Sequence, residues 1–133
     1  MLNIALPKGR LGDRVYALFK AVGYDCRAMD ADDRRLVLCD PGGQVQYLLV
    51  KPSDVAIYVE RGAADVGVVG KDVLLEQGSD VYELLDLGLG RCRMAVAAKA
   101  GFREDMQTPL RVATKYPEIA RRYYAGKSRE IEI

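Results

Sequence analysis

The sequence of 133 residues contains no histidine, and this absence excludes several kinds of active site. Neither a Ser-His-Asp triad nor a Cys-His pair can be built without it. A zinc site is disfavoured as well, because the three cysteines (Cys26, Cys39 and Cys92) lie far apart and form no CxxC pair. Chemistry in this chain must therefore use Lys, Arg, Asp, Glu, Tyr, backbone N–H groups, or a metal ion held by substrate phosphates.

Long apolar runs are also missing. No window approaches the roughly 18–20 apolar residues that a membrane span needs. The apolar run at the N-terminus is short and is broken by Pro7 and Lys8, which is unlike a secretory signal. An odd number of scattered cysteines is typical of small buried side chains in a reduced compartment. These features predict a soluble cytoplasmic protein with no membrane partner.

Neither sign of charge is in large excess over the whole chain, since 20 basic residues are balanced by 19 acidic ones and the net charge is +1. This balance excludes a charged disordered chain, and it disfavours nucleic acid as a partner. The C-terminal part is different, because residues 101–129 hold an excess of basic side chains: Arg111, Lys115, Arg121, Arg122, Lys127 and Arg129 among them. They form either a solvated helix face or a surface that faces an anion or a partner.

Strand and helix patterns alternate along the chain, which predicts an α/β fold with a mostly parallel sheet and one inserted hairpin. We expect a first helix that is capped by Asp13, runs to about Val22 with Val22 on its inner face, and stops at Gly23. We expect further helices at 52–61, at 71–78 and at 117–125, the last with Ile119 and Tyr123 facing inward. The expected strands are Leu2–Leu6, Leu36–Asp40, Gln44–Lys51, Ala64–Val69, Val81–Leu87, Arg91–Ala98, Leu110–Thr114 and a last one from Glu130.

Ligands of parallel α/β sheets bind at the carboxyl ends of the strands. This rule selects the loops after Leu6, Val69, Leu87 and Thr114. In the first of them, Lys8-Gly9-Arg10 joins a buried strand to a helix. Glycine there lets the backbone turn tightly, and the two cations and the free N–H groups of the helix start suit a phosphate. A plain strand-to-helix connection has the same appearance, so both interpretations stay open.

The other loops carry weaker signals. Gly70-Lys71-Asp72 suits either a polar ligand or an ordinary helix start. Gly88-Leu89-Gly90 lacks the third glycine of a dinucleotide fingerprint and suits a crossing between two lobes. Thr114-Lys115 could contact phosphate at a helix start, and one arginine of the Arg34-Arg35 pair could turn toward a site.

Four long motifs, taken together and in this order, closely resemble the ATP phosphoribosyltransferase family in its short form. The motifs are Ala5–Leu11, Pro52–Asp72, Asp80–Gly88 with Cys92-Arg93, and Arg111–Pro117 with Ile119–Tyr123. The resemblance implies a two-lobed fold like that of periplasmic binding proteins. The first lobe would comprise residues 1–90, and the start of a second, incomplete lobe residues 91–133.

The resemblance also implies the first reaction of histidine biosynthesis. ATP is joined through N1 of adenine to the anomeric carbon of phosphoribosyl pyrophosphate, and pyrophosphate leaves. The family requires Mg²⁺, which would bind through the substrate phosphates. Short-form members work in a hetero-oligomer with a regulatory subunit related to histidyl-tRNA synthetases, and a similar partner is expected here.

By the same resemblance, Arg10 and Arg34 are catalytic residues on the departing pyrophosphate, and Lys8 and Gly9 belong to that pocket. Asp72, Val73, Gly90 and Cys92 fall on the nucleotide side. These assignments suit the chemistry, because an oxocarbenium-like transition state builds negative charge on pyrophosphate that guanidinium groups and Mg²⁺ stabilise. No histidine base is needed, since adenine N1 has its own lone pair.

The chain departs from the family in length. Catalytic chains of the family are longer by several dozen residues, and the additional part carries the loop that grips phosphoribosyl pyrophosphate. We therefore expect the chain to be truncated at its C-terminus. The alternative to the enzyme is a non-catalytic fragment of the same fold that binds a nucleotide or another anion.

Overall fold

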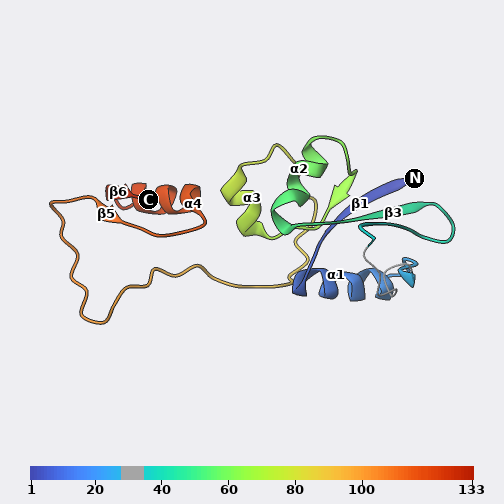
Figure 1. Ribbon diagram of the computed structural model, residues 1–133, viewed down its shortest axis with the longest axis horizontal. Coiled ribbons are helices and arrows are strands. Elements are labelled where there is room, and N and C mark those ends of the chain that lie inside the picture. Colours follow the sequence, from blue (N-terminus) through green and yellow to red (C-terminus); the bar gives the residue numbers. More distant parts are fainter. Residues whose placement is uncertain (28–34) are drawn as a thin grey trace. The chain divides into compact units, whose positions relative to one another are not determined.

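The computed structural model describes residues 1–27 and 35–133, in which strands and helices alternate (Figure 1). The strands are β1 (Leu2–Pro7), β2 (Val37–Cys39), β3 (Val45–Val50), β4 (Val66–Gly67), β5 (Leu110–Arg111) and β6 (Ile131–Glu132). The helices are α1 (Arg10–Ala21), α2 (Val55–Glu60), α3 (Lys71–Gln77) and α4 (Pro117–Ala125), and a 3₁₀ turn, η2 (Pro52–Asp54), precedes α2. The predicted α/β class is confirmed.

The chain divides into two compact units. Unit 1 consists of Met1–Leu74 and Gly78–Arg91, and unit 2 consists of Leu75–Gln77 and Cys92–Ile133. The lobe boundary expected between residues 90 and 91 stays a prediction.

Unit 1 is built on a four-stranded sheet with the order β2-β3-β1-β4. β1 pairs in parallel with β3, from Leu2 opposite Val45 to Pro7 opposite Val50, and in parallel with β4. β2 and β3 form the expected antiparallel hairpin. The sheet is therefore mostly parallel, as predicted, with the central strand β1 leading straight into the Lys8-Gly9-Arg10 loop.

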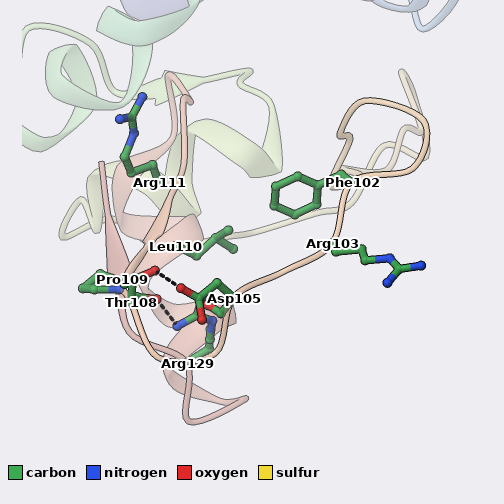
Figure 2. A pocket seen from close by; sticks show the side chains of 8 residues that line it. All are labelled: Phe102, Arg103, Asp105, Thr108, Pro109, Leu110, Arg111 and Arg129. Carbon is green, nitrogen blue, oxygen red and sulfur yellow. Dashed lines mark hydrogen bonds between the residues drawn. The ribbon is translucent and has the colours of Figure 1, made fainter.

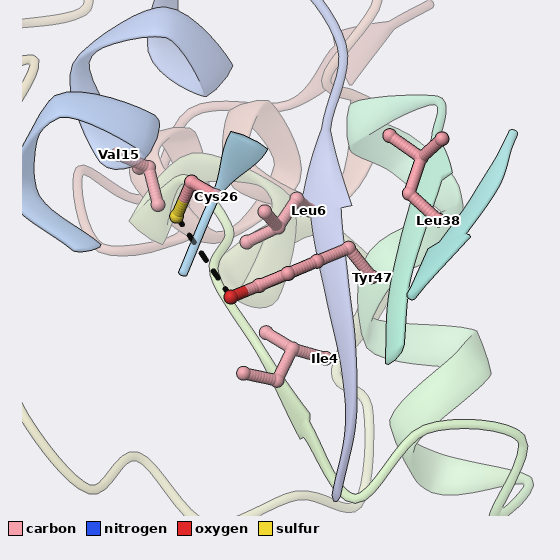
Figure 3. Close-up of a cluster of buried hydrophobic side chains, with 6 residues drawn as sticks. All are labelled: Ile4, Leu6, Val15, Cys26, Leu38 and Tyr47. Atoms are coloured by element: carbon pink, nitrogen blue, oxygen red, sulfur yellow. Dashed lines mark hydrogen bonds between the residues drawn. The ribbon is translucent and has the colours of Figure 1, made fainter. Parts of the chain in front are cut away.

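Both faces of this sheet are covered, because alternate residues of β1 point to opposite sides. Ile4 and Leu6 pack in one cluster with Val15 of α1, and Ala5 packs in another with Val55 of α2. Figure 3 shows the first cluster, in which the Tyr47 side chain passes Ile4 and Leu6 and points toward Cys26. Burying a side chain as large as Ile4, Leu6 or Val15 contributes about 1.5–3 kcal/mol, so this three-layer core holds β1 in place.

The first helix begins earlier than the sequence suggested. α1 starts at Arg10 with Gly9 at its N-cap, and Asp13 lies in the first turn instead of capping it. Val22 is 65% exposed, which contradicts its expected inward position, because the helix has already ended at Ala21. The stop at Gly23 is confirmed: its φ is +98°, and the N–H of Tyr24 reaches back to the carbonyl of Phe19.

Several expected strands are shorter or absent. β4 covers only Val66–Gly67 of the expected 64–69, and β5 only Leu110–Arg111 of 110–114. Residues 81–87 and 91–98 form no strand, although their composition favours extended backbone. A strand needs a hydrogen-bonding partner as well as an apolar pattern, and these segments lie unpaired and largely exposed among the described residues.

Unit 2 contains a small βαβ arrangement. β5 and β6 pair in parallel, with Leu110 opposite Ile131, and α4 connects them. The inner face of α4 differs from the expected one, because Tyr124 is buried whereas Tyr123 is 49% exposed. The strand predicted from Glu130 is confirmed by β6.

The cysteines differ in their surroundings. Cys26 is buried as expected, but Cys39 and Cys92 are exposed, and all three are free thiols. Cys39 lies on the edge strand β2 and Cys92 follows an irregular segment, so neither is covered by a packed layer. Within the described part of the chain, no helix has the length and apolar character needed to cross a bilayer.

Candidate functional site

The carboxyl ends of β1, β3 and β4 meet at one edge of the unit 1 sheet, and cations gather there. The N–H of Lys8 donates to the carbonyl of Val50 (2.9 Å), so Lys8 and Lys51 follow two neighbouring parallel strands. Both side chains are exposed, as is Arg10 in the first turn of α1. This edge therefore presents three cations to solvent where ligands of parallel sheets bind.

Gly9 shapes the loop between β1 and α1. Its backbone has φ +92° and ψ −164°, a conformation that residues with a Cβ rarely adopt. Its carbonyl accepts the N–H of Asp13 at 3.1 Å, which closes the first turn of α1. The chain thus turns from strand to helix within one residue and leaves Lys8 and Arg10 on either side of the turn.

Gly12 fixes how closely α1 approaches β1. A Cβ at this position would lie 2.1 Å from the carbonyl oxygen of Pro7, a distance that no side chain tolerates. The first turn of α1 can therefore rest against the end of β1 only because residue 12 is glycine. Arg10 is positioned by this contact, on the same turn.

Gly70-Lys71-Asp72 forms the corresponding connection after β4. α3 begins at Lys71 with Gly70 at its N-cap, and the N–H of Val73 donates to the carbonyl of Gly70 at 3.0 Å. A Cβ on Gly70 would lie 2.3 Å from Oδ1 of Asp72, so the Asp72 carboxylate folds back over the glycine. Asp72 and Val73 are half-buried and stand at the same sheet edge as Lys8.

The Gly88-Leu89-Gly90 turn is brought to the start of α1. Both glycines have φ of +65°, and Leu89 packs against the core cluster that contains Val15. A Cβ on Gly90 would lie 3.6 Å from Cδ1 of Leu11, which places this turn beside the helix that carries Arg10. Gly90 belongs to unit 1 and Cys92 to unit 2. The interpretation of the turn as a crossing between lobes stays a prediction.

The structure thus brings together six of the eight residues that the sequence proposed for the site: Lys8, Gly9, Arg10, Asp72, Val73 and Gly90 all lie in unit 1 at or beside one edge of its sheet. Arg34 lies outside the described residues. Cys92 is an exposed residue of unit 2. The roles of all eight stay predictions.

Lys51 was not among the residues predicted for the site. The strand Gln44–Lys51 was expected as half of a hairpin, and its end was not counted among the ligand-binding loops. The structure shows that this strand, β3, is also the parallel neighbour of β1, so its carboxyl end lies at the same edge. The signal was present in the sequence as a cation followed by Pro52 at a helix start.

Two of the four loops that the sequence selected differ from the expectation. The loop after Leu87 follows irregular backbone, because residues 81–87 form no strand. The loop after Thr114 belongs to unit 2, and there the carboxylate of Glu76 accepts the N–H groups of Glu118 and Ile119, both at 3.0 Å. The start of α4 is therefore already bound to an internal anion, and Lys115 lies over the ring of Tyr116.

A cleft of about 280 Å³ lies in unit 2, between Phe102 and strand β5 (Figure 2). Its half-buried arginine, Arg129, donates to the carbonyls of Asp105 and Thr108 (2.7 and 2.9 Å) and to Glu104. Hydrogen bonds from the Gln107 N–H and the Thr108 hydroxyl hold the pKa of Asp105 below its ordinary value. These groups are all used to fold the loop, and none of the predicted site residues lines this cleft.

Comparison with known proteins decides the family. A model of the ATP phosphoribosyltransferase family matches residues 51–133, more than half of the chain. The chain belongs to the ATP phosphoribosyltransferase family. The resemblance that the four motifs indicated is confirmed.

Relatives that are named ATP phosphoribosyltransferase match the whole chain or nearly all of it. The ATP phosphoribosyltransferase of Brachyspira hyodysenteriae is 53% identical over 133 residues, which is all of this chain and 65% of the relative. That of Clostridioides difficile is 47% identical over 135 residues, covering 99% of this chain and 64% of the relative. The chain therefore spans less than two thirds of the length of these ATP phosphoribosyltransferases.

The fold matches as well. The structure titled ATP phosphoribosyl transferase (HisG:HisZ) complex from Thermotoga maritima superimposes with a TM-score of 0.69 and 26% identity. The match covers all of this chain and 62% of that chain. The mostly parallel α/β architecture described above is thus the architecture of a member of this family.

Proposed function

We propose that this chain acts in the transfer of a phosphoribosyl group from phosphoribosyl pyrophosphate to N1 of ATP, with release of pyrophosphate. Family membership supports the reaction class. The observation that carries the proposal for this chain is the edge of the unit 1 sheet, where Lys8, Arg10 and Lys51 are exposed around the tight turn at Gly9. Three cations at the ends of parallel strands suit a ligand rich in phosphate.

The reaction needs positioning and charge stabilisation more than proton transfer. The bond between the anomeric carbon and the pyrophosphate oxygen breaks, and the lone pair of adenine N1 forms the new bond to that carbon. Negative charge develops on the departing pyrophosphate. Arg10 and Arg34 would stabilise this charge, with Lys8 and Gly9 in the same pocket.

The nucleotide would lie toward the other side of the edge. Asp72 and Val73 stand in the first turn of α3, and Gly90 leaves room for a close approach beside Leu11. Cys92 belongs to unit 2, and only the family resemblance assigns it to the nucleotide. A carboxylate such as Asp72 suits the hydroxyl groups of a ribose or the amino group of adenine.

Magnesium would be bound through the substrates. Among the described residues, no group of three or more Cys, Asp or Glu side chains is arranged to hold a metal ion. The edge itself is cationic, which suits phosphate oxygens and not a bare metal ion. Mg²⁺ bound to those oxygens would neutralise part of their charge, while Lys8 and Arg10 contact the rest.

A regulatory partner forms part of the proposal. The Thermotoga maritima structure is titled as a complex of HisG and HisZ. We propose that this chain also assembles with a separate regulatory subunit, related to histidyl-tRNA synthetases. Co-purification of the two chains expressed together from the source organism tests this assembly, and separate elution of both chains contradicts it.

Substitution of Arg10 by alanine tests the function. In a chain that also carries the loop for phosphoribosyl pyrophosphate, we expect Arg10→Ala to lower the rate of phosphoribosyl-ATP formation at least tenfold, because removing one contact to developing charge often costs about 10²–10³ in rate. The fold should be unchanged, since Arg10 is exposed. Arg14→Ala, four residues further along α1 and also exposed, is the matched control and should retain the wild-type rate.

A near-normal rate for Arg10→Ala would contradict the role given to Arg10. If the wild-type chain binds ATP but forms no product in the presence of phosphoribosyl pyrophosphate and Mg²⁺, the non-catalytic alternative is favoured. Calorimetric titration with ATP and an assay of product formation separate these two outcomes.

A further inference from the structure

Lys71 adds a fourth cation to the edge of the unit 1 sheet, but this cation is already paired. It is the first residue of α3 and follows β4 within four residues. Its ammonium group forms an ion pair with the carboxylate of Glu83. Lys8, Arg10 and Lys51 form none of the ion pairs found in the described part of the chain.

The backbone after α3 turns back and brings Glu83 to Lys71 at the start of that helix. α3 ends at Gln77, and its C-cap Gly78 has a φ of +61° that reverses the direction of the backbone. The N–H of Asp80 then donates to Oε1 of Glu60 (3.0 Å), which ties the returning segment to the end of α2. Glu83 follows three residues later and reaches the start of α3.

The segment that carries Glu83 is loosely packed. Its neighbours Tyr82 and Leu84 are 95% and 79% exposed, and the side chains of the pair are 60% (Lys71) and 46% (Glu83) exposed. Exposed ion pairs of this kind contribute little to stability, since water and salt screen them. The pair can therefore open at small cost when a stronger anion arrives.

We propose that Glu83 is a displaceable counter-anion that neutralises Lys71 until a phosphate group of the ligand takes its place. The proposal rests on the proposed function, because it concerns the same sheet edge. It makes Glu83 an internal competitor of the ligand and Lys71 a phosphate contact. A phosphate carries more charge than a carboxylate and offers more acceptor oxygens, so it wins the competition once it is bound nearby.

The test measures binding of inorganic triphosphate, which carries the phosphate chain of ATP without its adenosine. Glu83→Gln keeps the size of the side chain and removes its charge. We expect it to tighten triphosphate binding about two- to fivefold in calorimetric titrations, as the loss of an exposed competing pair predicts. In a Lys71→Gln background, the same substitution should have no effect.

Two controls separate this role from simpler explanations. Glu130→Gln makes the same change in net charge at an exposed position of unit 2, and it should leave triphosphate binding unchanged. Circular dichroism should show the wild-type spectrum for Glu83→Gln, because the side chain is exposed. An equal gain in Glu130→Gln would assign the effect to overall charge and overturn the proposal.

The proposal is also overturned if Glu83→Gln leaves triphosphate binding unchanged or weakens it, or if the gain persists without Lys71. Its failure is distinct from failure of the proposed function. The latter is judged by ATP binding and product formation in the wild-type chain, whereas Glu83 is judged by a ligand that cannot react.

Discussion

Tyr47 shows how one residue ties the unit 1 core together. It is completely buried, its hydroxyl donates to the carbonyl of Asp25 (3.3 Å), and it lies 3.8 Å from Sγ of Cys26. Burial raises the pKa of the Tyr47 phenol well above its ordinary value of 10.0. The neutral phenol is therefore the form that the fold requires.

This shift predicts a loss of stability in alkali. The unfolded chain ionises Tyr47 near its ordinary pKa and the folded chain does not, so the contribution is complete below about pH 10 and is lost above it. An absorbance titration should show the Tyr47 phenol ionising only when the fold is lost. Tyr47→Phe should remove this late step.

The outcome that contradicts this prediction is a Tyr47→Phe difference in the absorbance titration that appears while circular dichroism stays native. Tyr47→Phe should also lower the free energy of unfolding by about 0.5–1.5 kcal/mol at neutral pH, because a buried hydrogen bond is lost.

Among the elements, α1 matters most for the site, and its start depends on Gly12. The helix approaches β1 so closely that a Cβ would meet the Pro7 carbonyl oxygen at 2.1 Å. The sequence predicted Asp13 as the cap of this helix, which would leave Gly12 outside it. The position of Gly12 inside the first turn is a consequence of packing between a helix and a strand, which a local pattern does not reveal.

We expect Gly12→Ala to move the first turn of α1 away from β1. Overpacking of this kind costs about 1–3 kcal/mol, and the shift should also weaken binding of inorganic pyrophosphate at Lys8 and Arg10. Thermal unfolding and calorimetric titration measure the two effects. Gly126→Ala is the control, since a Cβ there would make only ordinary contacts at 3.6 Å. Wild-type stability and binding in Gly12→Ala would contradict the close approach.

The elements that the sequence predicted well are those with local signals. α4 has Pro117 at its start, and α2 ends before Gly62, whose φ is +72°. The β2–β3 hairpin has a turn in which the Asp40 carboxylate accepts the N–H of Val45 (2.8 Å). The segments 81–87 and 91–98, which were expected to be strands, had no such signal. An apolar pattern becomes a strand only when a partner strand is available for hydrogen bonding.

At the scale of the whole molecule, the stretch 80–87 leaves large apolar side chains in solvent. Tyr82, Leu84 and Leu85 are 95%, 79% and 74% exposed. Scattered apolar side chains are normal on protein surfaces, but three within four residues of extended chain form a candidate surface for association. Extended backbone without a partner adds free hydrogen-bonding groups to this surface.

We therefore expect this chain to self-associate as its concentration rises. Light scattering should show a mass above 14.7 kDa, and Leu85→Lys should return it toward that value. Val22→Lys replaces an apolar residue that is 65% exposed on another element, and it should leave association unchanged. A monomer of constant mass at all concentrations would contradict the prediction.

Most of the candidate site followed from the sequence, because its residues lie in contiguous motifs. Lys8-Gly9-Arg10 and Gly70-Lys71-Asp72 could each be assigned to a strand end from local pattern alone. Lys51 could not, because its place depends on which strand lies beside β1. The carboxylate that occupies the start of α4 was also hidden, since Glu76 lies 42 residues before Glu118.

The sequence alone determined the α/β class, the helices with clear end signals, the family and the exclusion of histidine-dependent chemistry. These follow from residue types and from short-range periodicity. Only the tertiary structure decided that three strands end at one cationic edge, that Gly12 sets the distance of α1, and that Lys71 is paired with Glu83. The physical reason is that strand neighbours, close backbone contacts and ion pairs join residues far apart in the chain, and their free energies exist only once the core has packed.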